Sequence, residues 1–347
     1  MDDDAVIATI EEMRRDVAAA PEIYRPGAFW EQLVEDNLDM LRREGIGNLK
    51  RTVSNNYYNW LTVSLRDPQM QLALRRWLRH PSLAPLRGRM EPASGLRTMG
   101  RPEAFDLTAK AARRYRFFVG CAWEEARRED TLGLSERLSE PEAGNPIRLW
   151  RGSRLISQDL ANSIVECSFA ARSGCVRDGG RIAELGAGYG RLAHVFSEAR
   201  ELTYCIFDIP PALAVSQWYL EQVLGAGRVV RYRRWADVAQ IEAALRPGSV
   251  AFFTPDQLDL FPDGWFELTQ TISTLPEMPA HQAEHFLALL AAKSSQAVFL
   301  KQWQRWRNDA DDVELTEDRY VLPAPWRLTD RRVDPIQPAF FNQLWCR

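Results

Sequence analysis

The residues that most clearly indicate chemistry lie in one stretch, RIAELGAGYGRLAHVF. An apolar run leads into Gly186, Gly188 and Gly190, and a pattern typical of a helix follows at once. Glycines let a ligand lie against the backbone, and the helix start offers unpaired N–H groups to a carboxylate or phosphate. The stretch predicts a strand, a glycine turn and a helix that bind a ligand. The alternative is that the turn only brings the helix and the strand close together.

Glu184, two residues before the first glycine, indicates which ligand suits this turn. A carboxylate there would repel a pyrophosphate, but it suits a ligand that carries an ammonium and a sulfonium, such as S-adenosylmethionine. The spacing also differs from the dinucleotide-binding G-x-G-x-x-G, because the third glycine stands two residues after the second. We therefore expect S-adenosylmethionine at Glu184, Gly186, Ala187, Gly188 and Gly190. A nicotinamide-dependent oxidoreductase is the alternative.

Two later segments extend the expected cofactor site. LTYCIFDIP reads as a second strand that ends at Asp208, about 20 residues beyond the glycine turn, where nucleotide-binding βαβ folds carry a ribose-binding acid. Asp208, with Ile209 beside it, is the ribose candidate, and a helix cap is its alternative. GSVAFFTPDQLDLFP supplies a third strand, after which Pro255, Asp256 and Gln257 are expected to face the adenine.

The periodicity of the rest of the chain predicts the elements that hold these residues. Helical periodicity dominates roughly the first 170 residues, as in AVIATIEEMRRDVAAA. From Arg181 onward, short apolar runs alternate with helical stretches, which is typical of βαβ units and a parallel sheet. GWFELTQTISTLPEM and LKQWQRWR supply a fourth and a fifth strand. We expect an α/β fold, with a mainly helical, substrate-covering lobe over residues 1–150 and a cofactor-binding domain over residues 151–347.

Composition and charge argue against several kinds of partner. The formal net charge of −3 gives no reason to expect a nucleic acid or an anionic membrane surface. The five cysteines are scattered without C-x-x-C pairs, so we expect reduced thiols and no metal site. The acidic, amphipathic start is unlike a secretory signal, and no stretch approaches the ~20 apolar residues of a membrane span. We expect a cytoplasmic protein, and a homodimer is left open.

Several of these motifs resemble one family. ELGAGYGRLAHVF, YCIFDIPPALAVSQWYL and TISTLPEM resemble successive motifs of the sugar O-methyltransferase family, within the class I methyltransferases. AFWEQLVEDNLDMLRREGIGNLKRTVSNNYYNWL resembles that family's N-terminal block. The chain differs at the end of the fourth strand, which is usually more polar in the family. The resemblance implies a Rossmann-like sheet and transfer of a methyl group from S-adenosylmethionine to a hydroxyl of a sugar or other small secondary metabolite, in a biosynthetic reaction.

A hydroxyl nucleophile needs a base, and the residues after the fourth strand are the candidates, because ligands of open α/β sheets bind beyond the carboxyl ends of the strands. Glu277 and His281 are four residues apart, so they share a face if a helix begins near Pro276. In the alternative, Glu277 is a first-turn helix residue and His281 lies on a solvated face. We expect a structural role for His194, on the helix after the glycine turn.

Polar and aromatic residues in the first half are the candidates for binding the acceptor. Arg51, Tyr57 and Tyr58 lie in one run, and Gln158 lies further along. Planar rings stack on sugar faces and amides bind hydroxyls, so these side chains suit a sugar. The alternative is a capped loop that leads into a core helix. A third functional hypothesis is a methyltransferase-like protein that binds ligand without turnover.

Overall fold

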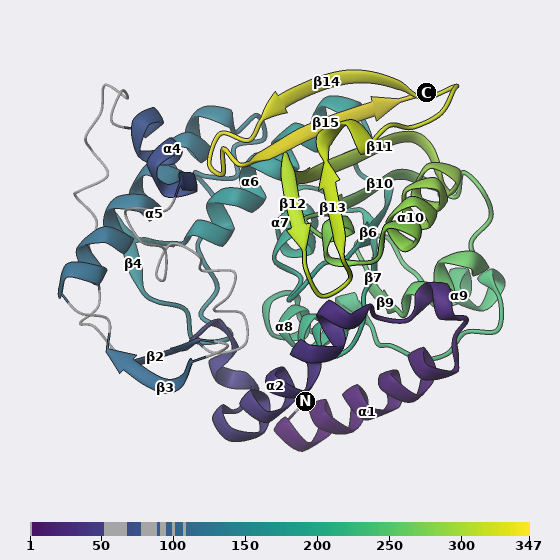
Figure 1. The fold of residues 1–347 in the computed structure, drawn as a ribbon, viewed down its shortest axis with the longest axis horizontal. Helices are drawn as coiled ribbons and strands as arrows, with labels where there is room; N and C mark the ends of the chain where they lie inside the picture. Colours follow the sequence, from purple (N-terminus) through teal and green to yellow (C-terminus); the bar gives the residue numbers. More distant parts are fainter. Residues whose placement is uncertain (1, 52–67, 78–88, 91–94, 99–100, 107–108) are drawn as a thin grey trace. The chain divides into compact units, whose positions relative to one another are not determined.

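The computed structural model describes residues 2–51, 68–77, 89–90, 95–98, 101–106 and 109–347, which form two compact units (Figure 1). The sheet unit comprises Met1–Glu35, Ala170–Asp334 and Ala339–Arg347. The helical unit comprises Asp36–Phe169 and Pro335–Pro338. This grouping differs from a single division at residue 150, since the first 35 residues belong with the sheet.

In the described residues, the sheet unit is built on eight strands in the order β8-β9-β7-β6-β10-β11-β15-β14. Their bounds are β6 Arg181–Leu185, β7 Thr203–Phe207, β8 Val229–Val230, β9 Val250–Phe253, β10 Phe266–Ile272, β11 Ser294–Trp303, β14 Arg327–Val333 and β15 Phe340–Cys346. The pairings from β8 to β11 are parallel, and β15 is antiparallel to both β11 and β14. The expected α/β fold is confirmed, and β6, β7, β9 and β10 lie at the first four expected strands. LKQWQRWR, expected as a fifth strand, covers the end of β11 and most of β12, and β8 was not predicted.

The chain reverses its direction of travel across the sheet at β6. From β6 it proceeds outward through β7 to β9, and it then returns to the other side of β6 as β10. Such a reversal leaves a crevice beyond the carboxyl ends of the two diverging strands, where open α/β sheets bind ligands. The fold therefore puts the expected cofactor turn, which follows β6, at the ligand-binding edge of the sheet.

Helices and a hairpin complete the sheet unit. α7 (Arg191–Ala199) packs against β7, α8 (Ala212–Leu224) against β9, and α10 (Ala280–Lys293) against β10 and β11. α9 is Val238–Ala244, and a hairpin of β12 (Arg305–Asn308) and β13 (Val313–Thr316) lies between β11 and β14 in the sequence. The inner strands β6, β7 and β9 are buried on both faces, which explains why they read as nearly continuous apolar runs.

The first 35 residues are held to the sheet unit by an apolar face and by hydrogen bonds. α1 (Asp3–Ala19) buries Val6, Ile10, Met13 and Val17, which recur at helical spacing, and it packs against α8. The Tyr232 hydroxyl donates to Asp16 over 2.6 Å. α1 is followed by the short helix η1 (Glu22–Tyr24) and by α2 (Ala28–Glu44). Amphipathic periodicity predicted these helices correctly, but it does not specify which partner they pack against.

The helical unit contains α4 (Pro68–Trp77), α5 (Ala109–Glu129) and most of α6 (Gln158–Ala170), with the short helix η2 (Ile46–Arg51). It also contains two small sheets, one of β1 (Arg89–Met90), β4 (Leu149–Arg151) and β5 (Arg154–Ile156), and one of β2 (Gly95–Thr98) and β3 (Arg101–Asp106). It is therefore mainly helical among the described residues, as expected.

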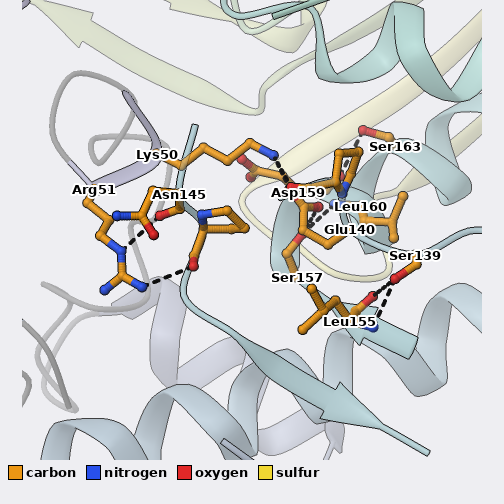
Figure 2. Close-up of polar contacts among 12 residues, drawn as sticks. Lys50, Arg51, Ser139, Glu140, Asn145, Leu155, Ser157, Asp159, Leu160 and Ser163 are labelled. Carbon is orange, nitrogen blue, oxygen red and sulfur yellow. Dashed lines mark hydrogen bonds and ion pairs between the residues drawn. The ribbon is translucent and has the colours of Figure 1, made fainter. Parts of the chain in front are cut away.

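A buried ion pair organises part of the helical unit (Figure 2). Lys50, which is fully buried, forms an ion pair with Glu140, whose other oxygen accepts a hydrogen bond of 2.6 Å from the Ser157 hydroxyl. Ser157 in turn accepts the backbone N–H of Leu160 over 2.9 Å, at the start of α6. The network thus ties η2 to the first turn of α6.

Candidate functional site

The glycine turn after β6 is tightly packed. Gly186 has φ +76°, and a Cβ added there would lie 2.0 Å from Thr274 Oγ1. Gly190, with φ +84°, begins α7, and its Cβ would lie 2.8 Å from Leu220. Both positions require glycine for left-handed backbone and for close packing, so the structural alternative accounts for these two glycines without a ligand. The turn also brings the ends of β6 and β10 together, because Thr274 follows β10 directly.

Asp208 follows β7 and is bound to this turn through the backbone. Its two carboxylate oxygens accept the N–H of Gly188 over 2.9 Å and the N–H of Ile209 over 2.7 Å. The pKa of Asp208 is raised to about 7, because the effect of burial exceeds the lowering by the backbone N–H groups of Ile209, Gly188 and Ala187. Asp208 therefore already has several backbone partners within the chain. A carboxylate has about four acceptor positions, and three backbone N–H groups use three of them, so capacity remains for about one ligand hydroxyl.

Glu184 belongs to a buried chain of hydrogen bonds across three strands. The Tyr204 hydroxyl on β7 donates to Glu184 over 2.7 Å, and the Gln270 amide on β10 donates to the same hydroxyl over 2.5 Å. Glu184 is 2% exposed and lies directly opposite Gln270 in the sheet register. This carboxylate therefore lies beneath the glycine turn and links the three strands that meet there.

The residues expected to face adenine follow β9 in the short helix η7 (Pro255–Leu260). Pro255 and Gln257 are buried, and the Gln257 amide donates to the Arg233 carbonyl over 3.4 Å. Asp256 accepts from Arg234 over 2.6 Å through one oxygen, whereas its other oxygen, Oδ1, is buried without a hydrogen-bond partner. A buried acceptor without a donor is unfavourable. Asp256 is therefore the residue of this group with hydrogen-bonding capacity left for a ligand.

Glu277 and His281 do not share a helix. Glu277 ends the short helix η8 (Leu275–Glu277), Met278 is extended at φ −131°, and α10 begins only at Ala280. The reason is local, because a residue that precedes a proline is disfavoured in the helical region and Pro279 follows Met278. His281 is exposed at the start of α10. The condition on which the pairing of Glu277 with His281 rested is therefore not met.

Glu277 lies instead within electrostatic reach of Asp208. Burial first, and then the negative charge of Asp208, raise the pKa of Glu277 to about 8, although the Trp30 side chain acts to lower it. The two carboxyls come from the segments that follow β7 and β10, on either side of β6 in the sheet. They therefore converge at the reversal point of the sheet, where the cofactor turn also lies.

Among the other histidines, His194 is 7% exposed on α7, with its ring 6.4 Å from that of Tyr219. His285 Nε2 lies 3.2 Å from the Tyr24 hydroxyl, which donates to Asp259. The residues of this Tyr24 cluster are far apart in the chain and share no motif, so the sequence does not indicate that they lie together.

Two of the four acceptor-binding candidates, Tyr57 and Tyr58, lie outside the described residues. Arg51 is 8% exposed and donates to the carbonyl oxygens of Asn145, over 2.8 Å, and Pro146, over 3.1 Å (Figure 2). Its guanidinium therefore ties η2 to a loop of the helical unit. Gln158 begins α6, is 1% exposed, and has neither amide atom in a hydrogen bond.

The described part of the chain contains neither a cluster of metal-binding side chains nor a membrane-spanning helix. No three His, Cys, Asp or Glu side chains there gather as ligands of a metal ion. No helix there is both long and apolar enough to cross a membrane. All five cysteines are free thiols, and four of them are buried, as expected.

No protein-family model matches the chain, and no curated protein does. Similar solved structures include magnesium protoporphyrin IX methyltransferase from Synechocystis PCC 6803, at 13% identity over 54% of this chain and 79% of that one, with a TM-score of 0.37. The Burkholderia thailandensis 1,6-didemethyltoxoflavin-N1-methyltransferase shows 13% identity over 55% and 79%, with a TM-score of 0.37. The [4+2]-cyclase SpnF shows 11% identity over 55% and 82%, with a TM-score of 0.40.

The fold assignment rests on the sheet of this chain itself. On one side of β6 lie three parallel strands, and on the other lie β10 and β11, with the antiparallel β15 between β11 and β14. A strand, glycine turn and helix unit begins this sheet at its centre. This arrangement is a doubly wound, Rossmann-like α/β fold. Because one fold hosts many activities, the activity itself must be argued from the site.

Proposed function

We propose that the chain is an S-adenosylmethionine-dependent methyltransferase that acts on a hydroxyl of a small acceptor. The observation that carries this proposal is the convergence of Asp208 and Glu277 beside the glycine turn at the reversal point of the sheet. Asp208 suits a hydroxyl of a ribose, and Glu277 suits the nucleophilic hydroxyl of an acceptor. A cationic ligand beside the two would favour their ionised forms, which burial disfavours.

The residues present fit the cofactor at three points. Asp208 keeps acceptor capacity for a ribose hydroxyl, and the unpartnered Oδ1 of Asp256 suits the amino group of an adenine. The main chain of the turn at Gly186 and Gly188 carries no side chain that would keep a ligand away. When bound, S-adenosylmethionine supplies a methyl group on a positively charged sulfur, which an oxygen nucleophile displaces in line.

In this mechanism Glu277 takes the proton of the acceptor hydroxyl. A carboxyl with a pKa of about 8 is mostly protonated at pH 7, and only its ionised form can accept the proton. Methyl transfer should therefore increase with pH up to about 8. Asp208, held by the backbone of the turn, binds rather than transfers protons.

A sugar or a related hydroxylated metabolite is the proposed acceptor. The family resemblance is the ground for this choice, and Gln158 supports it, because a buried amide without a partner is unfavourable until a hydroxyl or similar group satisfies it. We further propose that the protein acts in the cytoplasm and that its helical unit covers the acceptor.

Calorimetry separates this proposal from the alternatives. S-adenosylmethionine and its demethylated product should bind the wild type, and NAD should not. Asp208→Asn should weaken S-adenosylmethionine about ten- to a hundred-fold, because charge-assisted hydrogen bonds are lost. Asp237→Asn, at the exposed start of α9, is the matched control and should leave affinity unchanged. Binding of NAD instead, or equal affinity in both variants, would contradict the proposed cofactor site.

Turnover is tested with cofactor labelled in its methyl group and a set of glycosides. Transfer of label to a hydroxyl in the wild type, with a loss of about 10²-fold in Glu277→Gln, is the expected result. Tight cofactor binding without transfer to any acceptor would favour the binding protein without turnover.

A further inference from the structure

Ser273, the residue directly after β10, has a backbone conformation that serine rarely adopts. Its φ of +58° lies in the left-handed region, which is unfavourable for residues other than glycine. The Ser273 N–H donates to the Lys301 carbonyl over 2.8 Å, which prolongs the pairing of β10 with β11. The conformation therefore occurs where the chain leaves the sheet, at the carboxyl edge where open α/β sheets bind ligands.

The Ser273 hydroxyl has a donor beside it but no acceptor. The indole N–H of Trp303, the last residue of β11, donates to the hydroxyl oxygen over 3.1 Å. A serine hydroxyl also has one hydrogen of its own to donate, and no atom of the described residues accepts it. Ser273 is half-buried rather than enclosed. Its hydroxyl therefore keeps a donor for the oxygen of a ligand.

The Trp303 indole is held in place by neighbouring aromatic rings. Its ring centroid lies 4.2 Å from that of Phe340, which is opposite it in the register of β11 and β15, and 4.7 Å from that of Trp306 on β12. The buried Lys301 forms an ion pair of 3.1 Å with Asp334, and its ammonium lies 5.6 Å from the Phe340 ring. A donor that is fixed in this way orients the serine hydroxyl before any ligand binds.

Ser273 also adjoins the residues proposed to bind the cofactor and to take the proton. Thr274 follows it directly, and the Thr274 hydroxyl donates to the Gly186 carbonyl of the glycine turn over 3.3 Å. Glu277 follows four residues later, at the end of η8. Methyl transfer requires the acceptor hydroxyl to lie near both the cofactor and the base. A side chain that positions the acceptor is therefore needed in this segment.

We propose that Ser273 and Trp306 form a binding subsite for a sugar ring of the acceptor. The Ser273 hydroxyl donates to a sugar oxygen, and the half-buried Trp306 offers a flat ring, with an indole N–H that has no partner among the described residues. A serine in left-handed backbone fits this role, because glycine would relax the backbone but would remove the hydroxyl. The subsite rests on the proposed function for the identity of the acceptor.

The test follows the Trp303 indole N–H by ¹⁵N NMR, with and without the demethylated cofactor. The resonance absent from Trp303→Phe identifies this group among the twelve tryptophans. The probes are methyl glycosides of glucose, galactose, mannose and rhamnose. At least one should shift the resonance in a saturable way, because the hydroxyl that accepts from the indole also binds the sugar. No shift with any of the four would overturn the subsite.

Two variants remove the hydroxyl. Ser273→Gly also relaxes the left-handed backbone and should be at least as stable as the wild type, and Ser273→Ala keeps a side chain. In both, the ligand-free Trp303 resonance should move, and the affinity for the glycoside should fall about two- to ten-fold, as expected for one hydrogen bond. Ser295→Ala is the matched control at the amino end of β11, where the hydroxyl donates to the Phe266 carbonyl over 2.9 Å, and it should leave this affinity unchanged.

A purely structural serine would give a different result. If the hydroxyl only satisfies the indole, the Trp303 resonance moves in both variants while the affinity for the glycoside stays at the wild-type value, and the subsite is overturned.

Turnover separates the subsite from the proposed function. A glycoside that binds with the expected losses but receives no methyl group would support the subsite and refute methyl transfer to that sugar. Methyl transfer to a glycoside with an unchanged KM in Ser273→Gly would support the proposed function and overturn the subsite.

Discussion

Replacing Gly186 by alanine should destabilise the sheet unit through two separable effects. The first is the left-handed backbone, at φ +76°. The second is the overlap of the new Cβ with Thr274, whose Oγ1, Cγ2 and Cβ would lie 2.0, 2.4 and 2.7 Å away. Gly174 is a matched control in the same unit, because its φ is +77° and an added Cβ would meet nothing within 4 Å.

The magnitude follows from treating the two effects one at a time. A side chain in left-handed backbone costs about 1–2 kcal/mol, which is the loss expected for Gly174→Ala. Forcing an extra carbon into a packed site adds about 1–3 kcal/mol, so Gly186→Ala should lose about 2–5 kcal/mol in total. In a Thr274→Gly background the overlapping atoms are gone, and Gly186→Ala should then cost about as much as Gly174→Ala.

Urea unfolding, followed by circular dichroism, gives the free energy of unfolding for the four variants and the wild type. Equal losses for Gly186→Ala and Gly174→Ala would refute the reasoning, as would an unchanged cost of Gly186→Ala in the Thr274→Gly background. Either result would indicate that position 186 is glycine mainly because a ligand lies against it. The expected result would indicate that glycine is needed there mainly for the packing of the β6 end against the β10 end.

Two further predictions concern charge. Because folding raises the pKa of Asp208 to about 7 and that of Glu277 to about 8, the folded state binds more protons than the unfolded state between about pH 4 and pH 8. The free energy of unfolding should therefore fall as pH rises through that range and level off above it. In Glu277→Gln, chemical denaturation should show a shallower fall with pH. An equal slope in the variant and the wild type would contradict the raised pKa of Glu277. In the helical unit, Lys50→Met should lower the free energy of unfolding by about 3–5 kcal/mol, because Glu140 would keep a buried charge without its cation. Thermal melting should show that the double variant Lys50→Met, Glu140→Gln recovers part of that loss.

Much of the sheet unit could be predicted from sequence, for a physical reason. Parallel strands buried on both faces are apolar throughout, so β6, β7 and β9 stand out as short apolar runs, and the glycines of the turn mark where the first one ends. The place of Asp208 could be predicted because the apolar run of β7 ends directly before it in the sequence. Its backbone partners could not, because Gly188 lies 20 residues away and the contact exists only once the two strands pair.

The base was harder to predict, although part of the signal was present. Pro279 disfavours a helical Met278, so the sequence alone argues against a continuous helix from Glu277 to His281. The contact between the Gln282 amide and the Arg25 carbonyl left no such trace. An amphipathic helix reveals which of its faces is apolar, but the surface that covers this face is determined by the rest of the fold, and here the contact joins residues 257 positions apart.

The position of β15 also governs the order in which the protein can fold as it is synthesised. β15 is the last strand in the chain, yet it lies between β11 and β14 and pairs with both. Until the ribosome has released residues 340–346, β11 presents an unpaired edge and β14 has no neighbour. Such an edge can pair with another nascent chain, so the interval before β15 emerges is when this protein depends most on chaperones.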